Sequence, residues 1–301
     1  MKRALLLGII GSFFFAFTFV LNRSMNLSGG YWLWSAALRY FLTLPMMAVL
    51  LLRGKQISAV LKAIGKAPVS WMLWSTVGFG LFYAPLSAAS VYAESWFTAA
   101  TWQLTIVAGI LLTPLFGKKI PVKNLLLSGM ILLGIFIMQI PQIDNLGGEN
   151  ILAALGLILI AAFSYPLGNR KMMQVCEQQS LSTVQRTFGM TLCSMPFWVA
   201  CGICAGVHAG VPSGSQILQS LLVALFSGVI ATILFFKATD LVKNNQKQLA
   251  VIEATQSGEV IFTLLLGILI LHDAIPSALS FAGILLVIVG MILNSIAADE
   301  I

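Results

Sequence analysis

Two acidic residues lie in a segment that is otherwise apolar. The stretch IEATQSGEV, residues 252–260, places Glu253 and Glu259 inside an apolar run from Leu249 to Leu271. An ionised carboxylate is costly in hydrocarbon, so an acid in such a segment is a functional candidate that faces the interior of a helix bundle. Glu259 falls near the middle of the segment, where it is predicted to exchange a proton or to bind a cationic group of a substrate.

Each acid also has a structural interpretation. Glu259 could be a helix-packing group that is protonated or hydrogen-bonded to a neighbour such as Thr255. Glu253 lies about 9 Å nearer the end of the segment, at about 1.5 Å per helical residue, where it could pair with Lys243 or Lys247. We favour the proton or substrate role for Glu259 and the paired role for Glu253, and we keep both as candidate site residues.

Arg39 is a third charged residue within the apolar segments, eight residues inside the run 31–52. A charge at that depth needs a partner. Arg39 therefore either pairs with Glu259 or binds the carboxylate of a substrate, as in a carrier of amino acids or organic anions. With all three groups ionised, Arg39, Glu253 and Glu259 sum to −1, which favours a cationic or zwitterionic cargo.

Neutral polar and aromatic residues complete the predicted site. Aromatic faces can surround an organic cation, and amide or hydroxyl groups can line a cavity or join helices by hydrogen bonds. The candidates that lie well inside apolar segments are Gln256, Ser257, Trp102, Gln103, Tyr83 and Tyr165.

The composition requires that these residues be carried by membrane helices. Of the 301 residues, 59% are hydrophobic and 9% are charged, and the mean hydropathy is +0.96. A soluble protein has about 25% charged residues. Apolar runs of about 20 residues, long enough to span a bilayer as helices, recur ten times: 4–21, 31–52, 69–92, 97–116, 124–141, 151–169, 184–207, 216–236, 248–271 and 277–297.

The basic residues set the predicted orientation. With ten spans, all of the 17 Lys and Arg residues except Arg23 and Arg39 fall on one side. This positive-inside asymmetry places both termini in the cytoplasm. The isoelectric point near 9.4 is therefore a topology signal, and we expect no nucleic-acid partner.

Short matches indicate that the chain contains two copies of one unit. Asn22-Arg23 resembles Asn169-Arg170 at an offset of 147, and Arg39 matches Arg186 at the same offset. The predicted repeats are 1–146 and 147–301, with five helices each. Because five is odd, the second copy enters the membrane in the opposite orientation, and such inverted repeats bind substrate near the midplane between the halves.

The residues also resemble a known family. The stretches GFGLFYAPL (78–86), AAFSYPLGNRKMM (161–173) and LFSGVIATILFFKATDLV (225–242), together with 252–260, look like the bacterial multidrug resistance efflux transporters. These belong to the ten-helix, EamA-like type of the drug/metabolite transporter superfamily. The resemblance implies export of small molecules and leaves the substrate open.

Missing motifs narrow the mechanism. The chain has no G-x-x-x-x-G-K-[ST] motif for ATP, and its two histidines lie apart without an acid cluster for a metal. We expect no cofactor, no metal and no enzymatic activity. The predicted function is proton-coupled export of small cationic or amphipathic organic molecules by alternating access.

Two alternatives stay open. The chain could be a carrier of amino acids or other metabolites that works as an exchanger or uniporter, and a lipid-modifying enzyme is the least favoured reading. The expected partners are a small-molecule substrate, protons and the lipid bilayer. The expected location is the plasma (inner) membrane of a bacterium, where one chain suffices for a complete site and a homodimer is also compatible.

Overall fold

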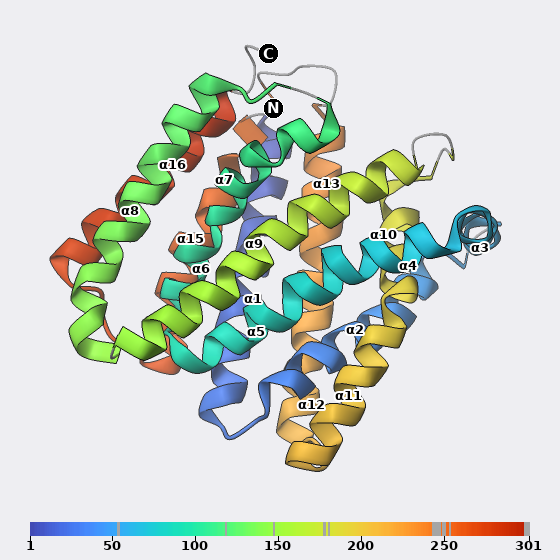
Figure 1. Cartoon of the computed structure of the whole chain (residues 1–301), viewed down its shortest axis with the longest axis horizontal. Helices are drawn as coiled ribbons and strands as arrows, with labels where there is room; N and C mark the ends of the chain where they lie inside the picture. The colour runs from blue at the N-terminus through green and yellow to red at the C-terminus, as the bar shows by residue number, and fades with distance from the viewer. Residues whose placement is uncertain are drawn as a thin grey trace.

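The computed structural model describes residues 1–52, 55–117, 119–146, 148–176, 179, 181–242, 248, 251–252 and 254–297. Every regular element in these ranges is a helix (Figure 1). The all-α membrane fold expected from the sequence is thereby confirmed, while the arrangement as two inverted five-helix repeats stays a prediction.

The helices of the first predicted repeat are α1 (Lys2–Leu27), α2 (Trp32–Leu50), α3 (Gln56–Lys66), α4 (Pro68–Ser75), α5 (Leu81–Tyr92), α6 (Ser95–Trp102), α7 (Leu104–Leu111) and α8 (Val122–Leu146). Those of the second are α9 (Gly148–Cys176), α10 (Thr183–Cys193), α11 (Met195–Ala209), α12 (Gly214–Val223), α13 (Thr232–Asp240), α15 (Gly258–Leu266) and α16 (Ala278–Ala297). Short π-helical turns η1 (Thr76–Gly80), η3 (Ala224–Ala231) and η5 (Gly267–Leu271), and 3₁₀ turns η2 (Thr113–Phe116) and η4 (Thr255–Ser257), join or extend them.

Seven of the helical segments in the described residues are long and apolar enough to cross a membrane, or eight if a bent pair counts as one span. The bent pair is α10 with α11, which meet at 46°. The predicted span 97–116 is instead a shorter apolar helical segment, Ser95–Leu111. Of the predicted span 248–271, the described residues include an apolar helical segment at Thr255–Leu271. The chain is an integral multi-pass membrane protein, and the count of ten spans stays a prediction.

Breaks in the predicted helices have local causes. Pro196 is the second residue of α11, and because proline has no N–H it cannot continue the hydrogen bonding of α10. Pro114 ends α7 in the same way, so that residues 113–116 form a 3₁₀ turn. Gln103 lies between α6 and α7 and belongs to neither helix. Single spans predicted at 97–116 and 184–207 are therefore each divided.

Helix α3 lies between the second and third predicted spans and was not predicted from the sequence. Val60 and Ala63 are buried, whereas Lys62 and Lys66 on the other face are exposed. This spacing is that of a surface helix with one apolar face. A search for apolar runs of about 20 residues overlooks it, because α3 has only 11 residues.

Helices α8 and α16, the last of the two predicted repeats, run side by side at one edge of the molecule (Figure 1). A Cβ atom on Gly134 would lie 2.6 Å from the carbonyl oxygen of Gly283, and one on Gly283 would lie 2.5 Å from that of Gly134. The backbones therefore touch at this crossing, which only glycine permits. Asn124 and Asn294 exchange buried hydrogen bonds farther along the pair. The two helices therefore pack closely against each other along this edge of the bundle.

Candidate functional site

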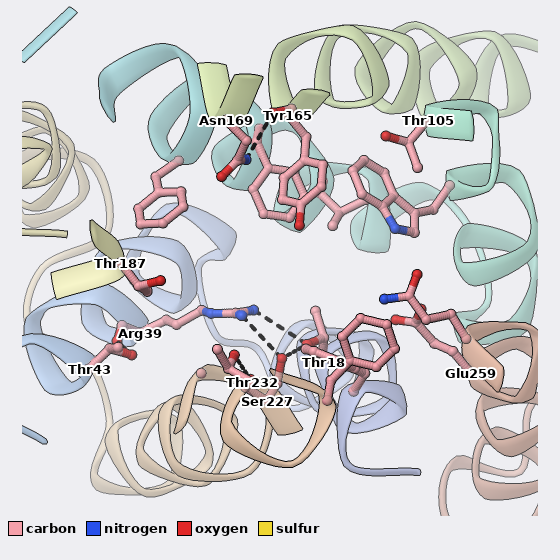
Figure 2. Close-up of a pocket in the computed structure, with 18 of the residues that line it drawn as sticks. Thr18, Arg39, Thr43, Thr105, Tyr165, Asn169, Thr187, Ser227, Thr232 and Glu259 are labelled. Atoms are coloured by element: carbon pink, nitrogen blue, oxygen red, sulfur yellow. Dashed lines mark hydrogen bonds between the residues drawn. The ribbon is translucent and has the colours of Figure 1, made fainter. Parts of the chain in front are cut away.

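A cavity of about 420 Å³ lies between elements of the two predicted repeats. Its walls come from α1, α2, α5, α6, α7, α9, α10, α13 and α15 and from the turns between them. The described residues of α8 and α16 contribute nothing to this wall. Figure 2 shows that Thr105, Tyr165 and Asn169 face Thr18 and Ser227 across the open space. Both repeats are thus needed to build the cavity.

Arg39 projects from α2 into this cavity and is held by neutral groups. Its Nη1 donates to Thr18 Oγ1 at 3.3 Å and its Nη2 donates to Ser227 Oγ at 3.1 Å. Thr18 also donates to Ser227 at 2.6 Å, so the two hydroxyls support each other. On its other side, the guanidinium Cζ lies 4.1 Å from the centre of the Tyr83 ring, within the range of a cation–π contact.

Glu259 lines the same cavity from the first turn of α15. Figure 2 shows Glu259 at one end of the cavity and Arg39 at the other. Both residues are described, and no ion pair joins them. The direct pairing considered from the sequence is therefore not formed, because hydroxyl groups and an aromatic ring hold Arg39 against the opposite wall.

The turn before Glu259 explains the neighbouring polar residues. Residues 255–257 form a 3₁₀ turn rather than part of a continuous helix. Thr255 Oγ1 donates to the carbonyl of Ile252 at 2.6 Å and Ser257 Oγ donates to that of Ala254 at 2.8 Å. Ser12 on α1 donates to the carbonyl of Thr255. These hydroxyls satisfy backbone groups that an irregular turn leaves without helical partners.

The structure separates the predicted cavity residues into two groups. Those on the wall are Trp102, Gln103, Tyr165, Gln256, Arg39 and Glu259. Ser257 is buried away from the wall, where its hydroxyl supports the turn. Tyr83 lies behind Arg39 and is fully buried, with its hydroxyl donating to Asn22 Oδ1 at 3.1 Å. Glu253 falls outside the described residues.

Three aromatic side chains gather on the cavity wall. The ring centres of Phe82 and Tyr165 are 4.8 Å apart, those of Phe82 and Trp102 are 5.0 Å apart, and those of Trp102 and Tyr165 are 5.6 Å apart. Five further rings line the same cavity: Phe15, Phe19, Tyr40, Phe79 and Phe235. Such a wall offers both apolar contact and π faces for a cationic group.

Several wall residues were missed from the sequence. Arg186 on α10 lines the cavity, although from the sequence it was interpreted only as a sign of orientation and of the repeat. Because it matches Arg39, which was a candidate site residue, the repeat could also have predicted Arg186 as a site residue. Thr18 and Ser227 carry no comparable signal, because hydroxyl residues are common in membrane helices and most of them bond to their own backbone.

A second hollow of about 440 Å³ continues from the cavity. The two share Thr105, Tyr165 and Gln256, among other residues. The second hollow extends to Asn124 and Arg170, where Arg170 Nη1 donates to the carbonyl of Gly109 at 2.6 Å. The open volume therefore reaches the end of the molecule at which α8 begins, which we call the basic end after Lys55, Lys119 and Lys171.

The opposite end is closed by hydrogen bonds, and we call it the sealed end. It comprises residues 22–35, 83–96, 210–216 and 267–274. Side chains there donate to backbone carbonyls of neighbouring helices and loops: Arg23 to Ser90 and Val91, Trp34 to Gly210, Gln216 to Tyr31, and Trp96 to Ala274.

Two acids lie within the sealed end. Asp273 is buried and accepts hydrogen bonds from the backbone N–H and the hydroxyl of Ser95 at the start of α6. Burial is the main cause that raises the pKa of nearby Glu94; its own backbone amide and Arg23 oppose that shift, and Asp273 adds to it. The Asp273–Ser95 contact joins the two predicted repeats directly.

Comparison with known proteins identifies the family. The family model described as "EmrE: Putative multidrug resistance efflux transporter" matches residues 2–300. "Uncharacterized protein YjlA" of Bacillus subtilis (strain 168) is 45% identical over 310 residues, which cover 99% of this chain and 95% of that protein. A relative from Shouchella clausii, "Uncharacterized 42.1 kDa protein in intracellular alkaline protease 3'region", is 42% identical over 267 residues, covering 85% of this chain and 70% of that protein.

One solved chain, "Crystal structure of protein", has the same fold. It superimposes with a TM-score of 0.57 at 14% identity and covers 100% of this chain and 99% of that chain. The match to the family model and the resemblance of the four stretches noted in the sequence lead to the same assignment. The chain belongs to the family of multidrug resistance efflux transporters, which is a family of membrane transporters rather than of enzymes.

Proposed function

We propose that this chain is a secondary-active exporter that moves small organic molecules by alternating access and couples that movement to protons at Glu259. The observation that carries the proposal is the carboxylate of Glu259 on the wall of a cavity built by both predicted repeats. A carboxylate open to that space can hold a proton or a cationic group of a substrate, but not both at once. Competition of this kind couples the movement of substrate to the movement of protons.

The shape of the cavity supports alternating access. Its wall runs from the middle of the molecule to Arg186, in the first turn of α10, and Met173, near the end of α9. Side-chain and backbone hydrogen bonds close the sealed end. If the basic end is cytoplasmic, as the charge asymmetry predicts, this conformation receives substrate from the cytoplasm and must open its sealed end to release it.

The family and the bacterial relatives support a location in a bacterial plasma membrane. Because elements of both predicted repeats line the cavity, we expect one chain to suffice for transport.

The proposal can be tested by reconstituting the purified chain into proteoliposomes with a panel of organic cations and amphipathic compounds. Uptake is measured with and without an imposed pH gradient. We expect the gradient to stimulate transport by the wild type and Glu259→Gln to abolish that stimulation. Glu149→Gln is the matched control, because Glu149 is exposed in the first turn of α9 and does not line the cavity. A folded Glu259→Gln protein that keeps full pH-driven uptake would exclude the coupling role.

A second candidate function is that of a metabolite exchanger or uniporter. It is favoured by one observation, which is that Arg39 and Arg186 both line the cavity and could bind an anionic group. Counterflow distinguishes the two functions. An exchanger accelerates uptake of labelled solute when the same solute fills the vesicle, and it does so without a pH gradient and in the Glu259→Gln variant.

A further inference from the structure

The charged groups on the cavity wall give a different balance from the one estimated from the sequence. Among the described residues that line the cavity, the ionisable groups of opposite sign are the guanidiniums of Arg39 and Arg186 and the carboxylate of Glu259. The sum made from the sequence included Glu253, which lies outside the described residues, and left out Arg186. The described part of the wall carries two positive groups and one negative group, which favours a ligand that has a negative group of its own.

Arg39 has hydrogen-bond donors and a positive charge available to bind such a negative group. A guanidinium has five N–H donors, and the two bonds to Thr18 and Ser227 use only two of them. Both acceptors are neutral, so the positive charge is oriented without being neutralised. Figure 2 shows the guanidinium directed into the open space. A planar pair of N–H donors matches the two oxygens of a carboxylate.

A purely structural arginine would be expected to lie in a sealed contact with an acid, because an unpaired buried charge is costly. Arg39 differs on both points. It is only partly shielded by protein atoms and lines the cavity, and Glu259 lies across the cavity from it. A ligand placed between them could satisfy both charges at the same time.

The opposite part of the wall suits a cationic group. Glu259 supplies a negative charge, and the contacting rings of Phe82, Trp102 and Tyr165 supply π faces. A volume of about 420 Å³ lies at the small end of the range of ligand pockets.

We infer that the substrate is a small amphoteric molecule, with a carboxylate that binds Arg39 and an ammonium group that lies toward Glu259 and the aromatic rings. This inference rests on the proposed function, since it takes the cavity as the transport site. Arg186, at the basic end of the cavity, attracts the carboxylate toward Arg39 from the open side.

The test measures equilibrium binding to the purified full chain, without any gradient, by calorimetry and by tryptophan fluorescence. The probes are linear ω-amino acids of increasing chain length. Each has two matched derivatives: the methyl ester, which removes the negative charge, and the N-acetyl compound, which removes the positive charge. At one or more chain lengths we expect the free amino acid to bind at least about tenfold more tightly than either derivative, as charge-assisted hydrogen bonds to both ends predict.

Variants assign the two charges to residues. Arg39→Gln should abolish the preference over the methyl ester while the ester itself binds within about twofold of its wild-type affinity. Arg39→Lys, which keeps the charge but loses the planar fork, should retain part of the preference. Arg186→Gln should slow association and reduce its dependence on salt. The comparison of ligands on the wild type needs no variant and stands even if Arg39→Gln does not fold.

The inference is overturned if the esters bind as tightly as the free amino acids at every length, or if no amino acid of the series binds at millimolar concentration. If the N-acetyl compounds bind as tightly as the free amino acids, the inferred contact of an ammonium group with Glu259 and the rings is overturned, and the substrate is an anion. Failure of the inference about the substrate can be distinguished from failure of the proposed function. Simple cations that are exported under a pH gradient while amino acids do not bind would overturn only this inference, whereas a carboxylate preference in a protein without proton coupling would overturn only the coupling.

Discussion

Asn22 and Asn169 hold matched positions in the two predicted repeats, yet their surroundings differ. Asn22 is 2% exposed and accepts a hydrogen bond from Tyr83, which lies under Arg39 at the sealed end. Asn169 lines the cavity, and among the described residues its amide donates to the backbone carbonyl of Tyr165 in its own helix. The same position is therefore closed in the first repeat and open in the second.

The matched arginines both line the cavity, but their surroundings differ. Arg39 has two hydroxyl partners and a ring beneath it, whereas Arg186 lies near the basic end. If the repeats exchange these two arrangements, the cavity closes at the basic end and opens at the sealed end, as expected of inverted repeats.

The largest effect on transport is expected from a cross-link that prevents the two repeats from exchanging their arrangements. Ser95 and Asp273 are in direct hydrogen-bond contact across the sealed end. In a background without the four native cysteines, the pair Ser95→Cys and Asp273→Cys should form a disulfide that abolishes transport, and reduction should restore it. Transport by proteoliposomes before and after oxidation measures the effect.

The matched control joins Asn124→Cys to Asn294→Cys. These side chains also contact each other, but they link α8 to α16, which we expect to move as one unit because their backbones touch at Gly134 and Gly283. Oxidation of this pair should leave transport intact. Full transport by the oxidised Ser95 and Asp273 pair would show that the sealed end does not open.

A smaller effect is expected in the chemical accessibility of the two asparagines. In the same cysteine-free background, Asn169→Cys should react with a water-soluble maleimide at least about tenfold faster than Asn22→Cys, because a buried thiol is shielded from the reagent. Adding a transported substrate, which makes the protein alternate between its two conformations, should reduce the ratio of the two reaction rates. Equal rates without substrate would mean that the two repeats do not differ in solution.

The sequence predicted the elements of the site better than their contacts. Apolar runs and charge placement located the membrane segments, and the cost of burying a charge in hydrocarbon singled out Arg39 and Glu259, both of which line the cavity. These predictions depend only on the cost of moving a side chain out of water, which can be estimated residue by residue.

The contacts could not be predicted in this way. Whether Arg39 pairs with Glu259 depends on the distance between α2 and α15, and the sequence contains no information on that distance. The orientation of Ser257 depends on a 3₁₀ turn at 255–257, because this turn changes which side chains share a face. The role of Arg186 was visible in the repeat, but it required the fold to show that both matched arginines meet one cavity.

The smallest effect concerns stability. Asn22→Ala removes the acceptor of the Tyr83 hydroxyl, a bond of 3.1 Å in a fully buried place, and leaving a buried hydroxyl unpaired costs about 1–3 kcal/mol. Asn169→Ala should change stability by less than about 0.5 kcal/mol, because water in the cavity can replace its side chain. The midpoints of thermal unfolding in detergent compare the two variants.

Tyr83→Phe provides the control for this comparison. The change removes the hydroxyl but keeps the ring under Arg39, so that the double variant with Asn22→Ala leaves no unpaired group. The double variant should therefore be more stable than the sum of the two single changes predicts. If Asn169→Ala destabilises the protein as much as Asn22→Ala, or if the double variant shows no recovery, the Asn22–Tyr83 bond does not distinguish the closed repeat from the open one.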